Sequence, residues 1–593
     1  MIKRTHNCGE LRVSEDGQEV RLNGWVNTIR DQGKGLVFID IRDRFGMTQV
    51  IFELEACDEA LVTNARSLRR EDCIGISGVL RRRDDSANPN IGTGHIEVVG
   101  KALQVYSRAG KLPILPDEHE AEKMSEEVRL RHRSLDLRRP SMQARLQMRH
   151  DLSKLTRDFF HRFGFLEVET PLLIRSTPEG ARDFVVPSRI YPGKWYALPQ
   201  SPQIFKQILM VSGCDRYMQI CKCLRDEDPR ADRQAEFTQI DLEMSFTDQD
   251  EVIKIMTSFL RKVVKELRDM ELGVIPQIPW QTAMDDYGCD RPDLRFELKL
   301  QDISELAADT KFKVFTSALE KEEGCVKAIV LPSAAKTFTR KKIDMLDETA
   351  KTHGAGGMPW VRWTDDGPEG GAAKFIAPIA DALAEQIGIK PGDLVVFGAD
   401  TWETCATALG QVRLRAAKLL SLMKGGWRAC WVVDFPMFRW VEARERWVSE
   451  HHPFTAPREE DIDRLESDPG DVLSAGYDLV LNGSEIGGGS IRIHDSELQQ
   501  RVFKVLGLTE EETQEKFGFL LEALQYGAPP HGGIAFGLDR LVMLLSGTDN
   551  IRDVIAFPKT QSGADLMVES PGPIDQEQLD ELRISVDPEP VEA

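Results

Sequence analysis

The sequence lacks the features that would place a chain in a membrane, in a secretory route or among the P-loop proteins. No apolar run approaches the roughly 18 residues of a membrane-spanning helix, and residues 1–11 hold no apolar signal segment. The ten cysteines are scattered, and the closest two, Cys221 and Cys223, fall in a strand pattern rather than a zinc knuckle. No glycine-rich loop ends in G-K-[ST]. We therefore expect a cytoplasmic protein with reduced cysteines and no membrane partner.

Positive charge is scarce overall but locally concentrated. The net charge of −21 argues against general affinity for nucleic acid. Residues 129–150 nevertheless hold seven arginines against one aspartate, and Arg81, Arg82 and Arg83 form a second run. These segments fit either a solvated or dimer-facing helix surface or a basic track for one particular nucleic acid.

The length of 593 residues predicts roughly three or four domains. Residues 1–105 read as three strands, a helix and two strands, which is the order of an OB-fold barrel. In this segment Phe38 lies on the polar face of its strand, where an aromatic ring can stack on a base. Residues 106–139, rich in proline and charge, predict a hinge.

A large α/β region follows from residue 140, and its amino-acid composition changes within it. Glycine- and alanine-rich stretches with amphipathic helices occupy residues 290–424, and charged strands resume after them. We therefore expect a domain inserted between a first part at 140–289 and a second part at 425–565. Residues 566–593 form a C-terminal extension, whose acidic end we expect to fray.

Residues 224–246, LRDEDPRADRQAEFTQIDLEMSF, predict an antiparallel hairpin with a long tip, and we expect Arg225 and Glu227 on one face of its outgoing strand. On its returning strand one face is apolar, with Ile240, Leu242, Met244 and Phe246. The opposite face carries Gln239, Asp241 and Glu243. Buried like charges are costly unless paired, so that face must line a wet cleft or meet cations. A charged hairpin on a surface sheet is the alternative.

Two later segments predict sites for phosphate and for Mg²⁺. In GGIAFGLDRLVMLL (532–545) glycines allow close approach of a ligand, and Arg540 opens a helix where a phosphate is favoured. In YDLVLNGSEIGGGSIRIH (477–494) a strand pair carries the acids Asp478 and Glu485, with Arg492 opposite. Two acids beside a polyphosphate are natural ligands for Mg²⁺.

Together with GFLEVETP (164–171), these segments resemble the three motifs of the class II aminoacyl-tRNA synthetases, in order. Matches at 177–189, 197–207, 288–296 and 451–455 make the chain similar to the bacterial-type aspartyl-tRNA synthetases. The resemblance implies an N-terminal OB-fold β-barrel and an antiparallel-sheet catalytic domain with an inserted α+β GAD domain. It also implies an ATP-dependent, AMP-forming aspartate–tRNA ligase, which makes aspartyl-adenylate and passes the aspartyl group to the 3′-end of tRNA-Asp.

The resemblance also assigns roles to residues. Arg225, Arg540 and Glu485 would be catalytic, and Asp478 with Glu485 would hold Mg²⁺. L-Aspartate would be bound by Glu179, Gln203, Lys206, Arg225, Asp241, His451 and Arg492, with the choice between His451 and His452 left open. ATP would be bound by Arg225, Asp226, Glu227, Gln234, Phe237, Glu485, Gly537, Leu538, Asp539 and Arg540. The tRNA anticodon would be contacted by Arg30, Gln32, Phe38, Gln49 and Arg81.

The resemblance leaves three matters open. In the family, leucine after the Arg-Asp pair of the first OB strand accompanies strict recognition of tRNA-Asp, and histidine accompanies enzymes that also charge tRNA-Asn. This chain has Gln32, whose amide can both donate and accept hydrogen bonds. Gln32 therefore favours relaxed specificity, in which tRNA-Asn is charged as well as tRNA-Asp. The first motif implies a homodimer. The rival readings are an asparaginyl or lysyl enzyme, or a non-catalytic tRNA-binding protein on a decayed synthetase core.

Overall fold

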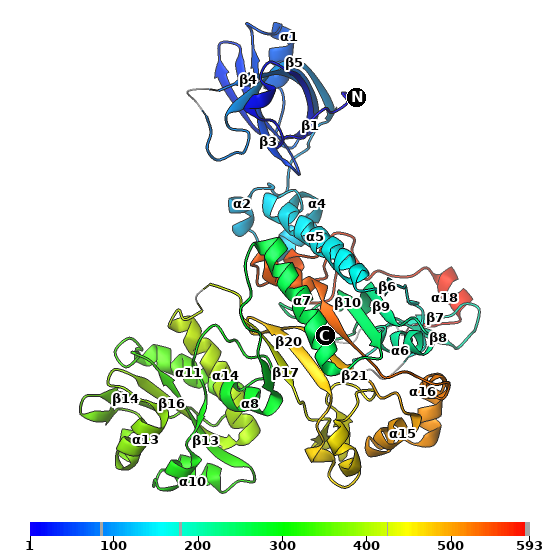
Figure 1. The fold of residues 1–593 in the computed structure, drawn as a ribbon. Helices are drawn as coiled ribbons and strands as arrows, with labels where there is room; N and C mark the ends of the chain where they lie inside the picture. The colour runs from blue at the N-terminus through cyan, green and yellow to red at the C-terminus, as the bar shows by residue number, and fades with distance from the viewer. Residues whose placement is uncertain (84–86, 177–180, 424, 587–593) are drawn as a thin grey trace. The chain divides into compact units, whose positions relative to one another are not determined.

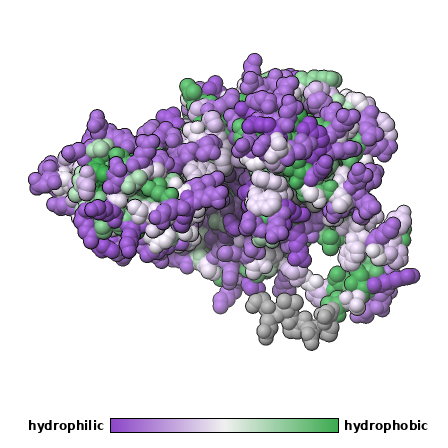
Figure 2. All heavy atoms as spheres, turned by 90° about the horizontal axis from the view of Figure 1, so that it is seen from below, coloured by the Kyte–Doolittle hydropathy of each residue, from purple (hydrophilic) through white to green (hydrophobic). Residues whose placement is uncertain are grey.

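The computed structural model describes residues 1–83, 87–176, 181–423 and 425–586. The chain forms two compact units (Figure 1). The first comprises Met1–Gln147 with Ala556–Thr560 and Ala564–Pro571, and the second comprises Met148–Ile555 with Gln561–Gly563 and the chain from Gly572. In the view of Figure 2 most of the surface is hydrophilic, and hydrophobic residues gather in small separate patches. Among the described residues, no helix is both long and apolar enough to cross a membrane.

The first unit contains the expected OB-fold barrel. Its elements are β1 (Glu19–Gly33), β2 (Leu36–Asp43), β3 (Gly46–Glu53), α1 (Glu59–Arg66), β4 (Cys73–Arg82) and β5 (Ile96–Ser107), and the strands close in the order β1-β2-β3-β5-β4. Alternation sets the core, since Val37, Ile39 and Ile41 of β2 are fully buried. The three strands, helix and two strands predicted from the sequence are confirmed.

Several arginines of the arginine-rich segment form ion pairs within this unit. The segment lies on α3 (Glu126–Arg131), α4 (Arg133–Asp136) and the start of α5 (Pro140–Arg162), after α2 (Glu118–Glu122). Arg133 Nη1 and Arg139 Nε each lie 2.7 Å from the buried Asp136 carboxylate, and Arg138 Nη1 lies 2.9 Å from Glu71. Part of the predicted basic track is therefore structural rather than available to a ligand.

The second unit is built on a mixed eight-stranded sheet in the order β11-β17-β20-β21-β22-β10-β9-β6. Its outermost strand pairs are parallel and the others antiparallel. The strands are β6 (Leu166–Glu167), β9 (Arg216–Leu224), β10 (Glu236–Ser245), β11 (Gln277–Pro279), β17 (Ala429–Val433), β20 (Gly476–Leu481), β21 (Ser484–Ile491) and β22 (His531–Gly537).

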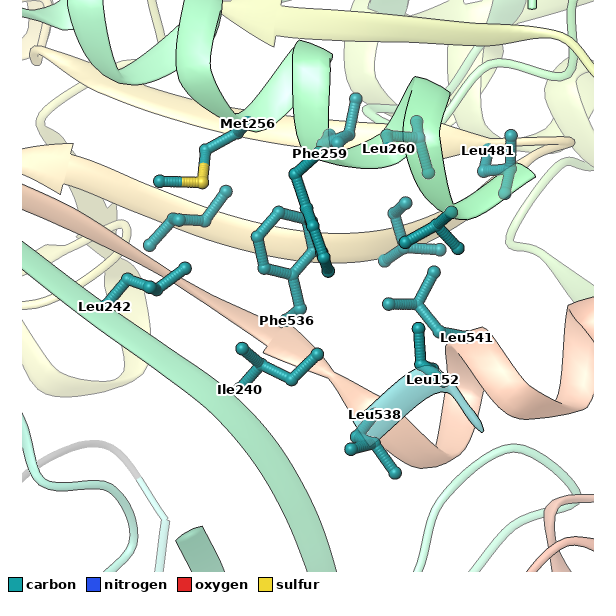
Figure 3. Close-up of a cluster of buried hydrophobic side chains, with 14 of the residues drawn as sticks. Leu152, Ile240, Leu242, Met256, Phe259, Leu260, Leu481, Phe536, Leu538 and Leu541 are labelled. Carbon is teal, nitrogen blue, oxygen red and sulfur yellow. The ribbon is translucent and has the colours of Figure 1, made fainter. Parts of the chain in front are cut away.

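One face of this sheet carries the main core. Apolar residues of α5, α7 (Gln249–Arg268) and α17 (Leu538–Ser546) cover it, and Figure 3 shows Phe259 of α7 packed against Phe536 of β22, above Ile240 and Leu242 of β10. Because this face is sealed by helices, the opposite face of β10 is left for polar chemistry. The predicted hairpin of β9 and β10 is confirmed.

The segment between β11 and β17 leaves this sheet and returns to it. It forms a five-stranded sheet of β12 (Gln301–Asp302), β13 (Gly324–Leu331), β16 (Leu394–Thr401), β14 (Trp360–Thr364) and β15 (Gly367–Glu369). Helices α11 (Arg340–Thr352) and α14 (Trp402–Leu419) pack on one face. Helices α10 (Lys313–Leu319) and α13 (Ala380–Ile387) pack on the other. An inserted α+β domain with its own core, as expected from the change of composition, is therefore present.

Shorter elements complete the second unit. They are β7 (Val185–Pro187), β8 (Trp195–Ala197), α6 (Gln203–Val211), α8 (Trp280–Tyr287), α9 (Ser304–Ala308), α12 (Ala373–Ile376), β18 (Phe438–Val441), β19 (Arg446–Ser449), α15 (Ser496–Val505), α16 (Glu510–Leu524) and α18 (Gln576–Leu582). Of these, α6 contributes most to the site, because it packs against β10 and β9.

Two details of the hairpin differ from the sequence prediction. Phe246 was expected in the core but is 74% exposed, because β10 ends at Ser245 and the backbone of Phe246 turns to a φ of 54°. Arg225 and Glu227 were expected on the outgoing strand, but β9 ends at Leu224 and both lie in the loop. The strict alternation of side chains stops where the strand stops.

Candidate active site

The polar face of β10 is the floor of the candidate site. Phe237, Gln239, Asp241 and Glu243 lie two residues apart and therefore share this face. The neighbouring strand β22 contributes only small residues opposite them, since Gln239, Asp241 and Glu243 pair with Gly537, Ala535 and Gly533. A Cβ on Gly533 would stand 2.2 Å from Glu243 Oε2, so only glycine leaves room for this carboxylate.

Four charged side chains meet at one end of this face. Lys206 Nζ of α6 lies 2.7 Å from Asp241 Oδ1 and 3.4 Å from Glu243 Oε2. Arg492, just after β21, donates from Nε to Glu243 Oε1 at 2.9 Å and from Nη2 to Glu243 Oε2 at 3.2 Å. All four residues, which we call the charge quartet, are almost fully buried. Their two positive and two negative charges cancel, which is the condition for burying them.

The quartet, together with Gln203 on the same helix as Lys206, offers polar atoms for further hydrogen bonds. Among the described residues, the buried atoms Asp241 Oδ2 and Gln203 Nε2 have no hydrogen-bond partner. Burial raises the pKa of the Asp241 carboxyl, and Lys206 offsets only part of that effect. Burial would raise the pKa of Glu243 as well, but Arg492 and Lys206 outweigh it and lower that pKa. A buried acceptor and a buried donor without partners are expected where a polar ligand binds.

The two adjacent histidines face different parts of the site. His452 Nε2 lies 2.7 Å from Arg492 Nη1, whereas His451 Nε2 lies 3.7 Å from Asp478 Oδ1. Burial and the nearby Arg492 charge lower the pKa of His452 well below its ordinary value. Burial also acts on His451, but Asp478 outweighs it and raises that pKa. His452, rather than the predicted His451, therefore contacts the charge quartet.

A cavity of about 190 Å³ lies at the other end of the same strand face. Its lining includes eight of the ten residues predicted to bind ATP: Arg225, Glu227, Gln234, Phe237, Glu485, Gly537, Asp539 and Arg540. The Arg225 guanidinium stands 5.2 Å from the centre of the Phe237 ring, and its buried Nε has no partner in the described parts of the chain. Arg540 Nη1 bonds the Glu485 carbonyl, and its Nη2 lies 3.8 Å from Asp232 Oδ2.

Three residues predicted to bind ATP have side chains that contact other parts of the protein. Leu538 is fully buried in the main core, so only its backbone could face a ligand. Asp226 Oδ2 pairs with Arg182 Nε at 3.1 Å, outside the cavity lining. Asp539 reaches the cavity, but its two oxygens accept from Arg149 and from the Thr238 N–H, the latter at 2.6 Å. Asp539 therefore anchors the end of β10 to α17 and α5.

The acids Asp478 of β20 and Glu485 of β21 form a small anionic cradle around Gly488. Asp478 Oδ1 and Glu485 Oε1 lie 2.7 Å and 3.6 Å from the point where a Cβ on Gly488 would stand. The neighbouring Asp478 charge, helped by burial, raises the pKa of Glu485, so these carboxylates repel. Within the described ranges no cluster of three or more His, Cys, Asp or Glu side chains could hold a metal ion. A pair of neighbouring carboxylates nevertheless fits Mg²⁺, which commonly binds one or two protein carboxylates plus phosphate oxygens.

In the first unit, the residues predicted to read the anticodon share one side of the barrel. Arg30 donates to Asp40 at 2.8 and 3.1 Å and to Gln49 Oε1 at 3.0 Å, and its guanidinium lies 6.0 Å from the Phe38 ring centre. Gln49 Nε2 donates to Glu97 at 2.8 Å. Arg81 pairs with that same Glu97 at 2.7 Å. Four of the five predicted residues therefore belong to one connected polar surface, and both ends of the Gln49 amide are held.

Gln32, the fifth, is exposed beside this surface. It lies where the register of β1 against β2 shifts between Asp31 and Gly33. Glu179 lies outside the described residues, so its predicted place beside the substrate ammonium group stays a prediction.

Comparison with known proteins bears on the whole chain. The family description "tRNA synthetases class II (D, K and N)" matches residues 125–561, and "OB-fold nucleic acid binding domain" matches residues 20–106. The aspartate–tRNA(Asp/Asn) ligase of Thermoanaerobacter pseudethanolicus is 50% identical over 590 residues, with 99% of each chain covered. The aspartate–tRNA ligase of Bacillus licheniformis is 49% identical, with the same coverage.

The chain belongs to the aspartate–tRNA ligase family of class II tRNA synthetases. Solved class II synthetases share its fold. The asparaginyl-tRNA synthetase of Pyrococcus horikoshii aligns with a TM-score of 0.59 at 20% identity, covering 94% of this chain and 99% of that one. The aspartyl-tRNA synthetase of Entamoeba histolytica gives 0.57 at 18% identity, covering 94% and 91%. Members of the family use ATP and tRNA, so the cavity and the barrel surface are the places to seek their sites.

For this synthetase, sequence reasoning missed one residue beside the quartet and left two others without their partners. Glu243 was recognised as facing the cleft, but its pairing with Arg492 was not predicted. Ser490, whose Oγ accepts from Arg492 Nη1 at 2.6 Å, was not considered. The choice between His451 and His452 was left open. Alternation on β10 could have singled out Glu243, because a fully buried acid on that face needs a cation.

Proposed function

We propose that the protein is an aspartate–tRNA ligase, which activates L-aspartate with ATP and transfers it to the 3′-end of tRNA. The full-length similarity to proteins of that name supports this function. The observation that carries the proposal is the charge quartet, whose Asp241 Oδ2 has no partner among the described residues, on the same strand face as the cavity. One strand thus lines up an amino-acid pocket and an ATP pocket.

The quartet accounts for the choice of amino acid. Lys206 and Arg492 would receive the side-chain carboxylate, while Asp241 Oδ2 would accept from the ammonium group and Gln203 Nε2 would donate to a substrate oxygen. Because the quartet is already neutral, aspartate adds one negative and one positive charge to it. Asparagine would add only the positive charge of its ammonium group, so the buried pocket would hold one uncompensated charge, at a cost of several kcal/mol.

In the first step the substrate α-carboxylate attacks the α-phosphorus of ATP and pyrophosphate leaves with the electrons of the broken bond. No protein nucleophile is required, so the acceleration comes from positioning and charge neutralisation. Arg225, whose buried Nε has no partner in the described part of the chain, would bridge the attacking carboxylate and the α-phosphate. Phe237 would cover the adenine ring and Arg540 would hold the outer phosphates. Asp478 and Glu485 would hold Mg²⁺, which when bound neutralises phosphate charge.

The barrel would bind the anticodon, with residues 1–105 as that domain and residues 106–139 as its hinge to a catalytic domain interrupted by residues 290–424. The connected surface of Arg30, Gln49 and Arg81 supports this assignment. We further propose that tRNA-Asn is charged as well as tRNA-Asp. An exposed amide at Gln32 can satisfy either base edge, and the Thermoanaerobacter relative is named for both tRNAs.

We also propose that the enzyme is a cytoplasmic homodimer. Strand β6 forms an edge of the sheet, and around it Phe163, Leu166, Leu172 and Leu173 are exposed apolar side chains. An unpaired strand edge with apolar neighbours suits a twofold contact with a second copy. Light scattering at micromolar concentration should give twice the chain mass of 66.8 kDa. A monomeric mass would refute the assembly.

ATP–pyrophosphate exchange across all twenty amino acids tests the function itself. We expect exchange with aspartate and Mg²⁺ and without tRNA, because the charge quartet and the cavity lie within one compact unit. Exchange driven by asparagine or lysine would instead indicate one of the rival synthetases. Absence of exchange with every amino acid, while tRNA still binds, would indicate a non-catalytic tRNA-binding protein.

A further inference from the structure

Arg492 has almost no donor capacity to spare. A guanidinium carries five N–H groups, and four of those on Arg492 have acceptors within the part of the chain that the structure describes. Nε and Nη2 each donate to Glu243, while Nη1 donates to His452 Nε2 at 2.7 Å and to Ser490 Oγ at 2.6 Å. Counting the described residues alone, one N–H, on Nη2, remains for a ligand.

The contact with His452 determines the protonation state of that ring. Arginine can only donate, so Nε2 must be unprotonated and the neutral ring carries its proton on Nδ1. That proton faces Thr455 Oγ1 at 3.4 Å. The Phe454 N–H lies 3.2 Å from the same Nδ1 and favours the other tautomer, but the shorter bond from a charged donor is the stronger of the two.

These contacts form a closed ring. From Arg492 it runs through His452 to Thr455, whose Oγ1 lies 3.1 Å from Ser490 Oγ, and Ser490 returns to Arg492. Thr455 and Ser490 are buried, and Thr455 pairs with Arg492 through a backbone bridge. The ring therefore ties the loop that carries His452 to the strand end that carries Arg492.

We propose that His452 is a positioning residue that sets amino-acid specificity through Arg492: its neutral ring holds Nη1, so that the Nη2 edge alone meets the side-chain carboxylate of the substrate. The inference rests on the proposed function. The Arg492 guanidinium, held by Glu243 on one edge and by His452 on the other, cannot rotate toward the neutral side-chain amide of asparagine. Once Nη1 is released, Arg492 can rotate about Glu243, which weakens the grip on aspartate and lessens the advantage of aspartate over asparagine.

The test compares two amides of different reach at position 452. In His452→Gln the amide oxygen lies about as far along the side chain as Nε2, so it can accept from Nη1. In His452→Asn the amide reaches only as far as Nδ1, so it can bond Thr455 but not Arg492. His494→Leu, which removes an exposed histidine two residues from Arg492, is the matched control.

The assay is ATP–pyrophosphate exchange by the full chain, with KM measured separately for aspartate, asparagine and ATP. For His452→Asn we expect kcat/KM for aspartate to fall about 10- to 100-fold, the loss of one charge-assisted hydrogen bond, and the preference for aspartate over asparagine to fall about 10-fold or more. His452→Gln should stay within about 3-fold of wild type, and the KM for ATP should not change in either variant. Ser490→Ala should lower the same preference, and its effect should not add to that of His452→Asn.

Several outcomes would overturn the proposal. They are equal impairment of the Gln and Asn variants at unchanged thermal stability, no impairment in either, or a rise in the KM for ATP equal to that for aspartate. Should His452→Asn fail to fold, the Gln variant and Ser490→Ala decide between the same outcomes. Wild-type protein without aspartate-dependent exchange would instead refute the proposed function, which the variants do not test.

Discussion

Replacing Gly488 by alanine would act directly on the acidic cradle, because the new Cβ would stand 2.7 Å from Asp478 Oδ1. Ordinary contact begins at 3.4 Å, so the carboxylate would have to retreat by roughly 0.7 Å, while the strand backbone can accept alanine. Mg²⁺ demands near-ideal octahedral geometry, and misplacement of a catalytic group by about 1 Å can cost about 100-fold. We therefore expect kcat/KM for ATP to fall about 10- to 100-fold, or about 1.4–2.7 kcal/mol.

The assay is ATP–pyrophosphate exchange titrated with Mg²⁺. Gly488→Ala should shift the half-maximal Mg²⁺ concentration upward and leave the KM for aspartate unchanged. Gly356→Ala, with nothing within 4 Å of its new Cβ, is the matched control and should behave as wild type. A normal Mg²⁺ requirement in a well-folded Gly488→Ala protein would refute the reasoning, because Asp478 and Glu485 would then not hold the ion.

Three further perturbations test other parts of the site. Arg492→Leu should lower kcat/KM for aspartate by at least ~100-fold, because it leaves Glu243 buried without its bidentate partner, with little effect on ATP; loss of ATP binding with intact use of aspartate would contradict the assignment. Burial lowers the pKa values of His452 and His531, so each takes up its proton at a lower pH in the folded chain than in the unfolded chain, where protonation begins below about pH 6.5. The free energy of unfolding should therefore fall as the pH drops below that value, by up to about 1.4 kcal/mol per pH unit for each histidine. Urea titrations of His452→Gln at several pH values should show a shallower fall than those of the wild-type protein. An unchanged dependence on pH would contradict a buried neutral ring at His452. Gln32→Leu should raise the preference for tRNA-Asp over tRNA-Asn at least ~10-fold in side-by-side aminoacylation and leave pyrophosphate exchange unaffected, because leucine cannot bond either base edge; an unchanged ratio would mean that Gln32 does not read the final base.

Much of the framework could be predicted from the sequence because it depends on local pattern. Alternation along β2 and β10 sorted apolar from polar faces, and it placed Asp241 and Glu243 on a face that had to line a wet cleft or meet cations. The order of strands and helix in the barrel, and the change of composition that marks the inserted domain, are likewise local signals. Glycines ahead of Arg540 at the start of α17 predicted a phosphate site, and Gly537 and Arg540 both line the cavity.

The tertiary structure decided which of these groups meet. Glu243 and Arg492 are 249 residues apart, and only the register of β10, β22 and β21 brings them together. His451 and His452 share one local sequence, yet the loop turns one toward Asp478 and the other toward Arg492. Phe246 left the predicted core because the strand ended one residue earlier, which no alternation pattern could reveal. Local pattern determines the face on which a side chain lies, whereas the partner that it finds there depends on packing between distant segments.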